Sequence, residues 1–181
     1  MLRALVCSLV ILAAGAGQAS AAALRYFTFE AASAAARHRS ADITVVVKPG
    51  MLSSRVLKLY RKRGADLDLK KPDGSFSLRQ LAGAVGESEQ DLLDMKLYAV
   101  DPKDGQGFAH GACDGADRAW IAINPVKAYQ DLRIYVLKYD AAAKAPAICE
   151  VLDYRWRGEF RAPVKKSKFR DEVGAAGGIR R

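Results

Sequence analysis

Three strand-like segments follow one another between residues 118 and 156, and only short connections separate them. They cover 118–123, 132–139 and 147–156, and each combines β-branched and aromatic residues with turn residues such as Asn124-Pro125 at its end. Two neighbouring parallel strands need a crossover of a dozen or more residues, usually a helix. These connections are too short for such a crossover, so the segments are predicted to form an antiparallel meander.

Four more segments of the same kind precede the meander, over 24–30, 42–48, 55–61 and 94–100. One helix is indicated between them, because Ser77-x-x-Gln80 forms a capping box and an apolar i, i+3, i+4, i+7 pattern runs from Leu78 to Val85. Gly86 is a natural end for that helix, and the alanine-rich segment 31–39 favours a second short one. We therefore predict a mainly β fold: a small antiparallel β-sandwich-like domain with one short helical insertion near 77–93. The alternative is an α+β arrangement with the helix packed on one sheet.

The first 21 residues have the pattern of a cleaved signal peptide. Arg3 supplies a positive charge, an uncharged apolar run covers 4–16, and Ala19-Ser20-Ala21 is a small-x-small cleavage site. A membrane-spanning helix needs about 20 apolar residues, so this run is too short for an anchor. Cleavage is expected after Ala21 or Ala23, which leaves a soluble mature protein without a transmembrane segment. The predicted location is the periplasm or the exterior of the cell.

Export changes the meaning of the cysteines, because disulfides form in oxidising compartments. Cys7 lies within the signal segment, so Cys113 and Cys149 are the two cysteines of the mature chain. Only one intramolecular pairing is possible, and we predict a Cys113–Cys149 disulfide. A redox-active or nucleophilic thiol is the rival interpretation, but there is no Cys-x-x-Cys and no adjoining basic cluster to lower a thiol pKa.

The positive charge of the chain is concentrated at its C-terminal side. The formal net charge is +9, and residues 155–181 hold nine Lys or Arg against three acidic residues, a net +6. Apolar periodicity is lost in this region, so we predict a single globular domain over 22–160 and a flexible basic tail over 161–181. The tail residues predicted to contact an anionic surface are Arg161, Lys165, Lys166, Lys168 and Arg170. The simpler alternative is a solubilising extension with no specific partner.

Residues that carry chemistry are sparse. His38 and His110 are the two histidines, and no nucleophile elbow, Walker loop, dinucleotide fingerprint or zinc-protease motif occurs. No metal site and no cofactor are predicted. The aspartates between 101 and 117 lack the spacing of a calcium loop and are interpreted as turn formers: Asp101, Asp104, Asp114 and Asp117. Five aromatic residues are interpreted as core or interface residues: Trp120, Tyr135, Tyr139, Tyr154 and Trp156.

These observations favour an exported, soluble, non-enzymatic protein of the cell envelope. Its predicted partner is an anionic polymer or lipid, or another envelope protein, contacted through the domain and the basic tail. Nucleic acid is not expected, because no recognition motif accompanies the basic residues and export argues against it. Two alternatives remain: a secreted enzyme of unrecognised type, and a subunit of a surface assembly that uses β-edge contacts.

Overall fold

A computed structural model describes residues 23–50, 54–72, 76–101, 103, 108–114, 116 and 118–161, the side chain of Arg161 excepted. The predicted signal peptide and the tail beyond Arg161 lie outside the described residues. The strands are β1 Arg25–Ala31, β2 Ile43–Lys48, β3 Arg55–Arg61, β4 Leu67–Lys70, β5 Lys96–Val100, β6 Ala119–Ile123, β7 Leu132–Asp140 and β8 Ala145–Arg161. The helices are α1 Ala34–Arg39, α2 Leu78–Val85 and α4 Ala109–Ala112.

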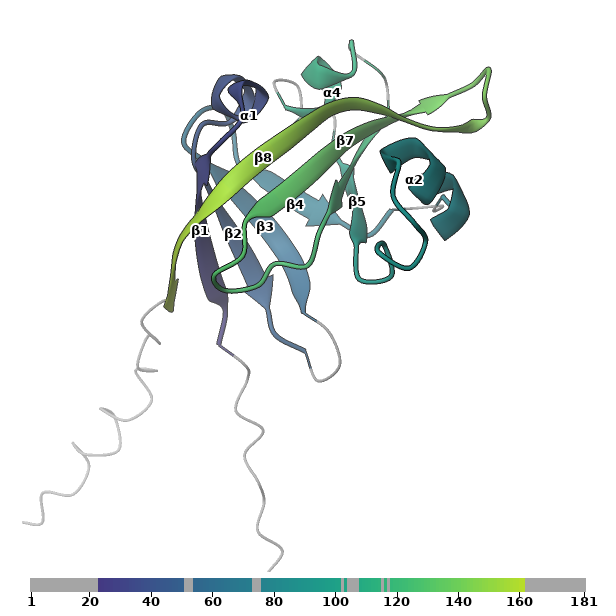
Figure 1. Cartoon of the computed structure of the whole chain (residues 1–181). Coiled ribbons are helices and arrows are strands. Elements are labelled where there is room, and N and C mark those ends of the chain that lie inside the picture. Colours follow the sequence, from purple (N-terminus) through teal and green to yellow (C-terminus); the bar gives the residue numbers. More distant parts are fainter. Residues whose placement is uncertain are drawn as a thin grey trace, which may run out of the picture.

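The strands within this described part close into one antiparallel barrel in sequence order, β1 to β8 (Figure 1). The barrel closes because β1 pairs with β8 along its whole length, from Arg25 opposite Arg161 to Ala31 opposite Tyr154. The prediction of a mainly β, antiparallel fold is confirmed, and the prediction of a sandwich is wrong. Both architectures bury one face of each strand and so show the same alternation in sequence. What distinguishes them is the pairing of the first strand with the last.

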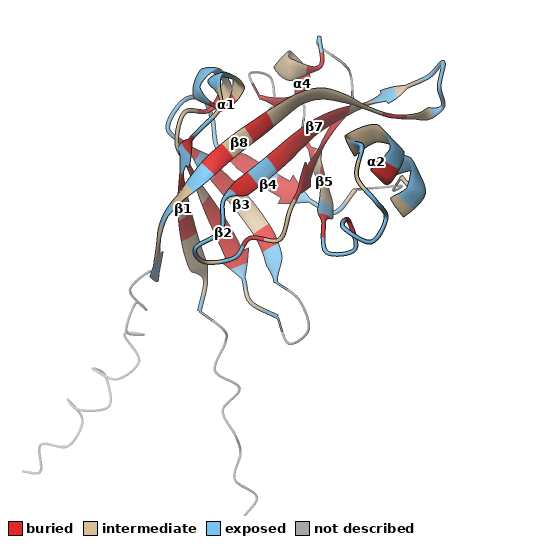
Figure 2. Ribbon diagram, in the orientation of Figure 1, coloured by how far each residue is buried: buried red, intermediate tan, exposed pale blue. Residues whose placement is uncertain are grey.

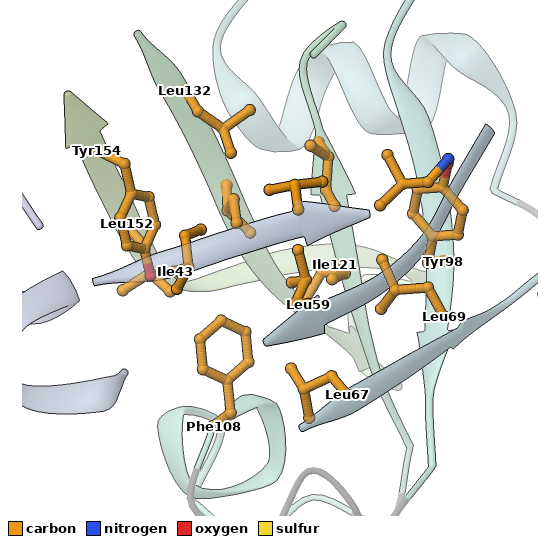
Figure 3. Close-up of a cluster of buried hydrophobic side chains, with 14 of the residues drawn as sticks. Ile43, Leu59, Leu67, Leu69, Tyr98, Phe108, Ile121, Leu132, Leu152 and Tyr154 are labelled. Carbon is orange, nitrogen blue, oxygen red and sulfur yellow. The ribbon is translucent and has the colours of Figure 1, made fainter. Parts of the chain in front are cut away.

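The inside of the barrel is filled by apolar side chains. Inward-facing residues of successive strands, such as Phe29, Val45 and Ile121, are at most 1 % exposed. Figure 3 shows part of this cluster, with Phe108 reaching into it from the segment that leads to α4. An eight-stranded barrel is just wide enough for side chains to fill its interior. The interior is therefore a packed core, and hollows must be sought at its ends and on its outer wall.

Helix α2 packs against the outside of the barrel and forms a second, smaller core. Figure 2 shows α2 beside the wall of the barrel. Leu81 and Ala82 of α2 share a buried cluster with Trp120 of β6 and Tyr135 of β7. The predicted capping box is confirmed, since the Ser77 hydroxyl accepts the Gln80 N–H and the Gln80 side chain accepts the Ser77 N–H. The predicted stop at Gly86 is confirmed by its left-handed φ of 73°.

The two ends of the barrel differ. Helices α1 and α4 cover one end, which we call the helical end (Figure 1). There the Ser40 hydroxyl bonds the Tyr154 hydroxyl at 2.7 Å, and burial raises the pKa of Tyr154 to about 12. Strand β1 begins and β8 finishes at the opposite end, which we call the terminal end. The predicted tail is therefore attached at the terminal end.

Candidate binding surface

The disulfide fastens the helical end of the barrel. Cys113, directly after α4, and Cys149, in β8, lie at disulfide-bonding distance with their Cα atoms 5.1 Å apart. Cys113 is 2 % exposed and belongs to the main core. The pair ties the connection between β5 and β6 to the wall of the barrel. This geometry matches the predicted Cys113–Cys149 pairing and indicates a structural bond.

The histidines do not meet. His38 is exposed on α1, whereas His110 is buried in α4 and its ring nitrogens contact the carbonyl oxygens of Ala116 and Val100. His110 therefore holds the backbone of its own segment against β5. Across the described ranges, no group of three or more His, Cys, Asp or Glu residues is arranged to hold a metal ion.

The described aspartates of the 101–117 region act locally. The Asp101 carboxylate accepts the Lys103 backbone N–H at 3.0 Å and pairs with Lys70 at 3.1 Å. The Lys103 N–H bond, followed by the Lys70 bond, lowers the pKa of Asp101 below its ordinary value. Asp114 adopts a left-handed φ of 54°, as turn residues do. Asp104 and Asp117 lie outside the described residues.

The predicted aromatic residues are spread over three environments. Trp120 and Tyr135 lie beneath α2, and Tyr154 lies inside the barrel. Tyr139 stacks on Phe76 at the surface, at a ring separation of 6.4 Å. Trp156 packs its ring on the core and is partly exposed. Trp156 thus combines core packing with partial exposure, and it lines a surface hollow.

A group of exposed cations lies toward the terminal end. Some basic residues are paired with acidic ones, as in Arg39–Glu150 and Arg133–Asp153. Others near the helical end, such as Arg37 and Arg63, have no carboxylate within 4.0 Å among the described residues. We call five exposed cations toward the terminal end the basic rim, and none of them has a carboxylate within 4.0 Å among the residues that the structure describes: Lys48, Arg55, Lys71, Lys96 and Lys127. Sequence reasoning missed the basic rim because its members come from five different segments of the chain. The predicted tail residues Lys165, Lys166, Lys168 and Arg170 lie outside the described residues, and of Arg161 only the backbone is described.

The basic rim borders two adjoining hollows, which we call the basic groove. One is about 400 Å³ and is lined by Arg55, Lys71, Lys96 and the apolar surfaces of Pro72 and Leu97. The other is about 260 Å³ and includes Lys96 and Lys127, with Asp94 as its one acidic residue among those described. The hollows share Ser54 and Lys96, so four cations face one continuous depression with an apolar floor.

The short fourth strand explains why the basic groove exists. Strand β4 pairs with β5 only at Leu69–Val100 and Lys70–Ala99, so nothing described pairs between the beginnings of β3 and β5. The Tyr98 hydroxyl spans the gap and accepts the Val56 N–H at 3.2 Å. Burial raises the pKa of Tyr98, which keeps this hydroxyl neutral. Between the beginnings of β3 and β5, the barrel wall is therefore closed by the Tyr98 side chain. The basic groove lies on the outer side of this part of the wall.

Comparison of the chain with protein-family models, with curated proteins and with solved structures finds no match. None of the helices in the described ranges is long and apolar enough to cross a membrane. The surface described above is therefore interpreted from its own chemistry.

Proposed function

We propose that this protein is an exported, non-enzymatic component of the cell envelope that binds an anionic surface with the terminal end of its barrel. The observation that carries the proposal is the coincidence of two cationic features. The basic rim lies toward the end at which β8 finishes, and the basic tail continues the chain from Arg161 at that end. The predicted signal peptide and the Cys113–Cys149 pair are consistent with an oxidising compartment.

Electrostatics favours this mode of binding. A basic residue near an anionic lipid surface contributes about 1 kcal/mol, and the attraction falls off within a Debye length of about 8 Å at physiological salt. Four cations around one groove, together with the tail, therefore provide enough attraction for reversible attachment. The four groove cations are exposed on the folded protein, so their binding to an anionic surface requires no rearrangement of the core.

Co-sedimentation of the mature full-length protein tests the proposal. The ligands are vesicles of phosphatidylglycerol and phosphatidylcholine and, separately, purified anionic cell-wall polymer, with pure phosphatidylcholine vesicles as the neutral reference. Binding to one of the anionic ligands is expected at low salt and is expected to be lost near 1 M salt, where the Debye length is about 3 Å. Failure to sediment with either anionic ligand at low salt would refute the proposal.

Two matched sets of substitutions locate the binding surface. Four Lys/Arg→Gln changes in the basic groove are expected to weaken binding at least about tenfold, in a variant combining Arg55→Gln, Lys71→Gln, Lys96→Gln and Lys127→Gln. Four changes near the helical end remove the same charge and are expected to alter binding by less than about twofold, in a variant combining Arg37→Gln, Lys62→Gln, Arg63→Gln and Lys103→Gln. An equal loss in both variants would contradict a localised surface.

A further inference from the structure

A second surface lies along β8, where this strand runs beyond its neighbour. The pairing of β7 with β8 begins at Leu132–Tyr154, so residues 155–161 of β8 have β1 as their one strand partner among the described residues. Beside this stretch lies the loop between β6 and β7, which contributes Ala128 and Tyr129. A hollow of about 350 Å³ is lined by these two residues and by β8 from Trp156 to Glu159.

Two aromatic rings dominate this hollow. The Trp156 ring is held by the core, with its centroid 5.6 Å from both Phe27 and Phe29. The Tyr129 ring lies 5.8 Å from Trp156 at an interplanar angle of 53°, and the residue is 88 % exposed. Trp156 is therefore a rigid base, and Tyr129 extends it into solvent as a nearly bare aromatic surface.

Tyr129 is held in this position at a conformational cost. Its φ is 63°, in the left-handed region where a bulky side chain is an outlier. Such a conformation is unfavourable for a bulky residue, and strained residues of this kind cluster at functional sites. Because the Tyr129 ring is almost fully exposed, core packing does not explain why its backbone is held in this conformation. This combination indicates a contact surface for a ligand.

Polar groups flank the two rings. Arg157 is a bulge residue, since Thr28 lies opposite Gly158 and Phe29 opposite Trp156. The Glu159 carboxylate accepts two hydrogen bonds from Arg25, at 2.6 and 2.7 Å. The Asp131 carboxylate accepts the backbone N–H of Trp156 at 2.9 Å. An Arg25–Glu159 ion pair and the Asp131 carboxylate thus accompany the aromatic pair.

A second hollow adjoins the basic groove. Asp131 borders this second hollow of about 350 Å³, together with Asn124 and the Arg133–Asp153 ion pair. Asn124 in turn borders the basic groove. The aromatic hollow and this second hollow share no lining residue among those described, but Asp131 of the second accepts the backbone N–H of Trp156 of the first. A longer linear ligand on Tyr129 and Trp156 would therefore pass Asp131 to reach Asn124 and the groove.

We propose that the Tyr129–Trp156 hollow binds the sugar rings of an envelope glycan. A sugar ring has apolar C–H faces that pack on aromatic rings, and hydroxyls that exchange hydrogen bonds with carboxylate, guanidinium and amide groups. Tyr and Trp offer such contact area at a low entropic cost. The inference rests on the proposed function, because it identifies the anionic envelope ligand as a polysaccharide. The packing of a sugar ring on Tyr129 and Trp156, however, does not depend on the charge of the ligand.

Other ligand classes fit this hollow less well. A single-stranded nucleic acid also stacks on aromatic rings but needs a uniformly positive channel for its phosphates. Here the carboxylates of Asp131, Asp153 and Glu159 lie along the path. Addition of a peptide strand to the β8 edge is opposed by the bulge at Arg157 and by the charged side chains beside it.

Tryptophan fluorescence of the full mature chain tests the proposal. The chain has two tryptophans, and Trp120 is 5 % exposed beneath Phe76 and α2, so a ligand in the hollow is expected to change the emission of Trp156. The ligands are neutral chitotetraose and peptide-free glycan strands prepared from peptidoglycan. We expect saturable changes with Kd on the order of 0.1–1 mM, absent in Trp156→Phe and retained in Trp120→Phe.

Tyr129→Asn is the decisive variant. Asparagine tolerates the left-handed conformation, so this change removes the ring without disturbing the loop. Affinity for the glycan is expected to fall about tenfold, the order of one aromatic contact. Tyr60→Ala is the matched control, because Tyr60 is a 40 % exposed tyrosine on β3, away from the hollow, and it is expected to leave affinity unchanged.

The outcomes separate this inference from the proposed function. Binding of chitotetraose is expected to persist in 0.5 M salt and in the four-residue groove variant, whereas attachment to anionic ligands is not. If the protein binds the glycans but does not sediment with the anionic ligands, the proposed function is refuted. The inference that the Tyr129–Trp156 hollow binds sugar rings would still hold. The inference is wrong if Trp156 emission responds to neither glycan at about 10 mM, or if Tyr129→Asn binds as tightly as the wild type.

Discussion

Single residues at the helical end show how tightly this barrel is closed. Arg61 is 8 % exposed, and its guanidinium lies 5.1 Å from the centre of the Phe108 ring. Its Nε donates to the Ala65 carbonyl, while Nη1 has no hydrogen-bond partner in the described part of the chain. Burial is the largest influence on this group and lowers the pKa of Arg61. The Arg61 guanidinium therefore has little room to move and little access to solvent.

Gly64 is needed at this place for two reasons. Its φ is +87°, and a Cβ there would lie 3.0 Å from Nη2 and 3.1 Å from Cζ of Arg61. Gly64→Ala is therefore expected to lower the free energy of unfolding by about 1–3 kcal/mol, measured by urea denaturation. Gly83→Ala is the control, because Gly83 lies within α2 with open space around its Cα. That change is expected to stabilise the protein by up to about 1 kcal/mol. Equal effects of the two substitutions would contradict the packing argument.

At the scale of elements, α2 depends on its first turn. The Ser77 hydroxyl accepts the Gln80 N–H at 3.2 Å, and Gln80 Oε1 accepts the Ser77 N–H at 3.0 Å. Ser77→Ala is expected to destabilise the protein by about 1 kcal/mol in urea denaturation, because an N-terminal N–H of the helix loses its acceptor. Gln80→Ala keeps the Ser77 bond and is expected to cost less. A larger effect of Gln80→Ala would show that its contact with the Lys144 carbonyl matters more than the cap.

The elements are also where sequence patterns were most informative. The seven predicted strand segments and the capped helix are all present, because each combines local residue preferences with a buried face. Strand β4 was missed because four residues, Leu67–Lys70, alternate apolar and charged positions over too short a stretch to stand out. The last strand was predicted to end at Trp156, but it continues to Arg161. Its final residues are largely polar and give no apolar pattern, and they are held in the strand by backbone pairing with β1.

The candidate sites were less predictable than the elements. The disulfide pairing followed from counting two cysteines. Lys96 and Lys127 come together only because β5 and the loop after β6 meet at the terminal end. Tyr129 gave no signal, because its role depends on a left-handed backbone and on the distant Trp156. Contacts between residues far apart in sequence cannot be read from a single chain.

At the scale of the whole molecule, the disulfide is expected to make a large contribution to stability. Cys113 and Cys149 are separated by 36 residues. Closing a loop of this length is worth roughly 4 kcal/mol by chain entropy. The double variant Cys113→Ser/Cys149→Ser is expected to lose about 2–5 kcal/mol in urea denaturation. Reductant is expected to lower the wild-type midpoint and to leave the variant unchanged; a wild-type midpoint insensitive to reductant would contradict a bonded pair.

The same closure that defines the barrel also constrains how it can fold. Arg25 and Glu159 are 134 residues apart in sequence, yet they form a two-pronged ion pair across the seam between β1 and β8. Long-range pairings of this kind slow folding, because chain entropy is lost before the contacts are gained. Until its last strand is available, the chain has β1 and β7 as unpaired edges open to other chains. A polypeptide delivered from its N-terminus must therefore keep those edges apart from other chains until the final strand arrives, so aggregation and completion of the barrel compete at that step.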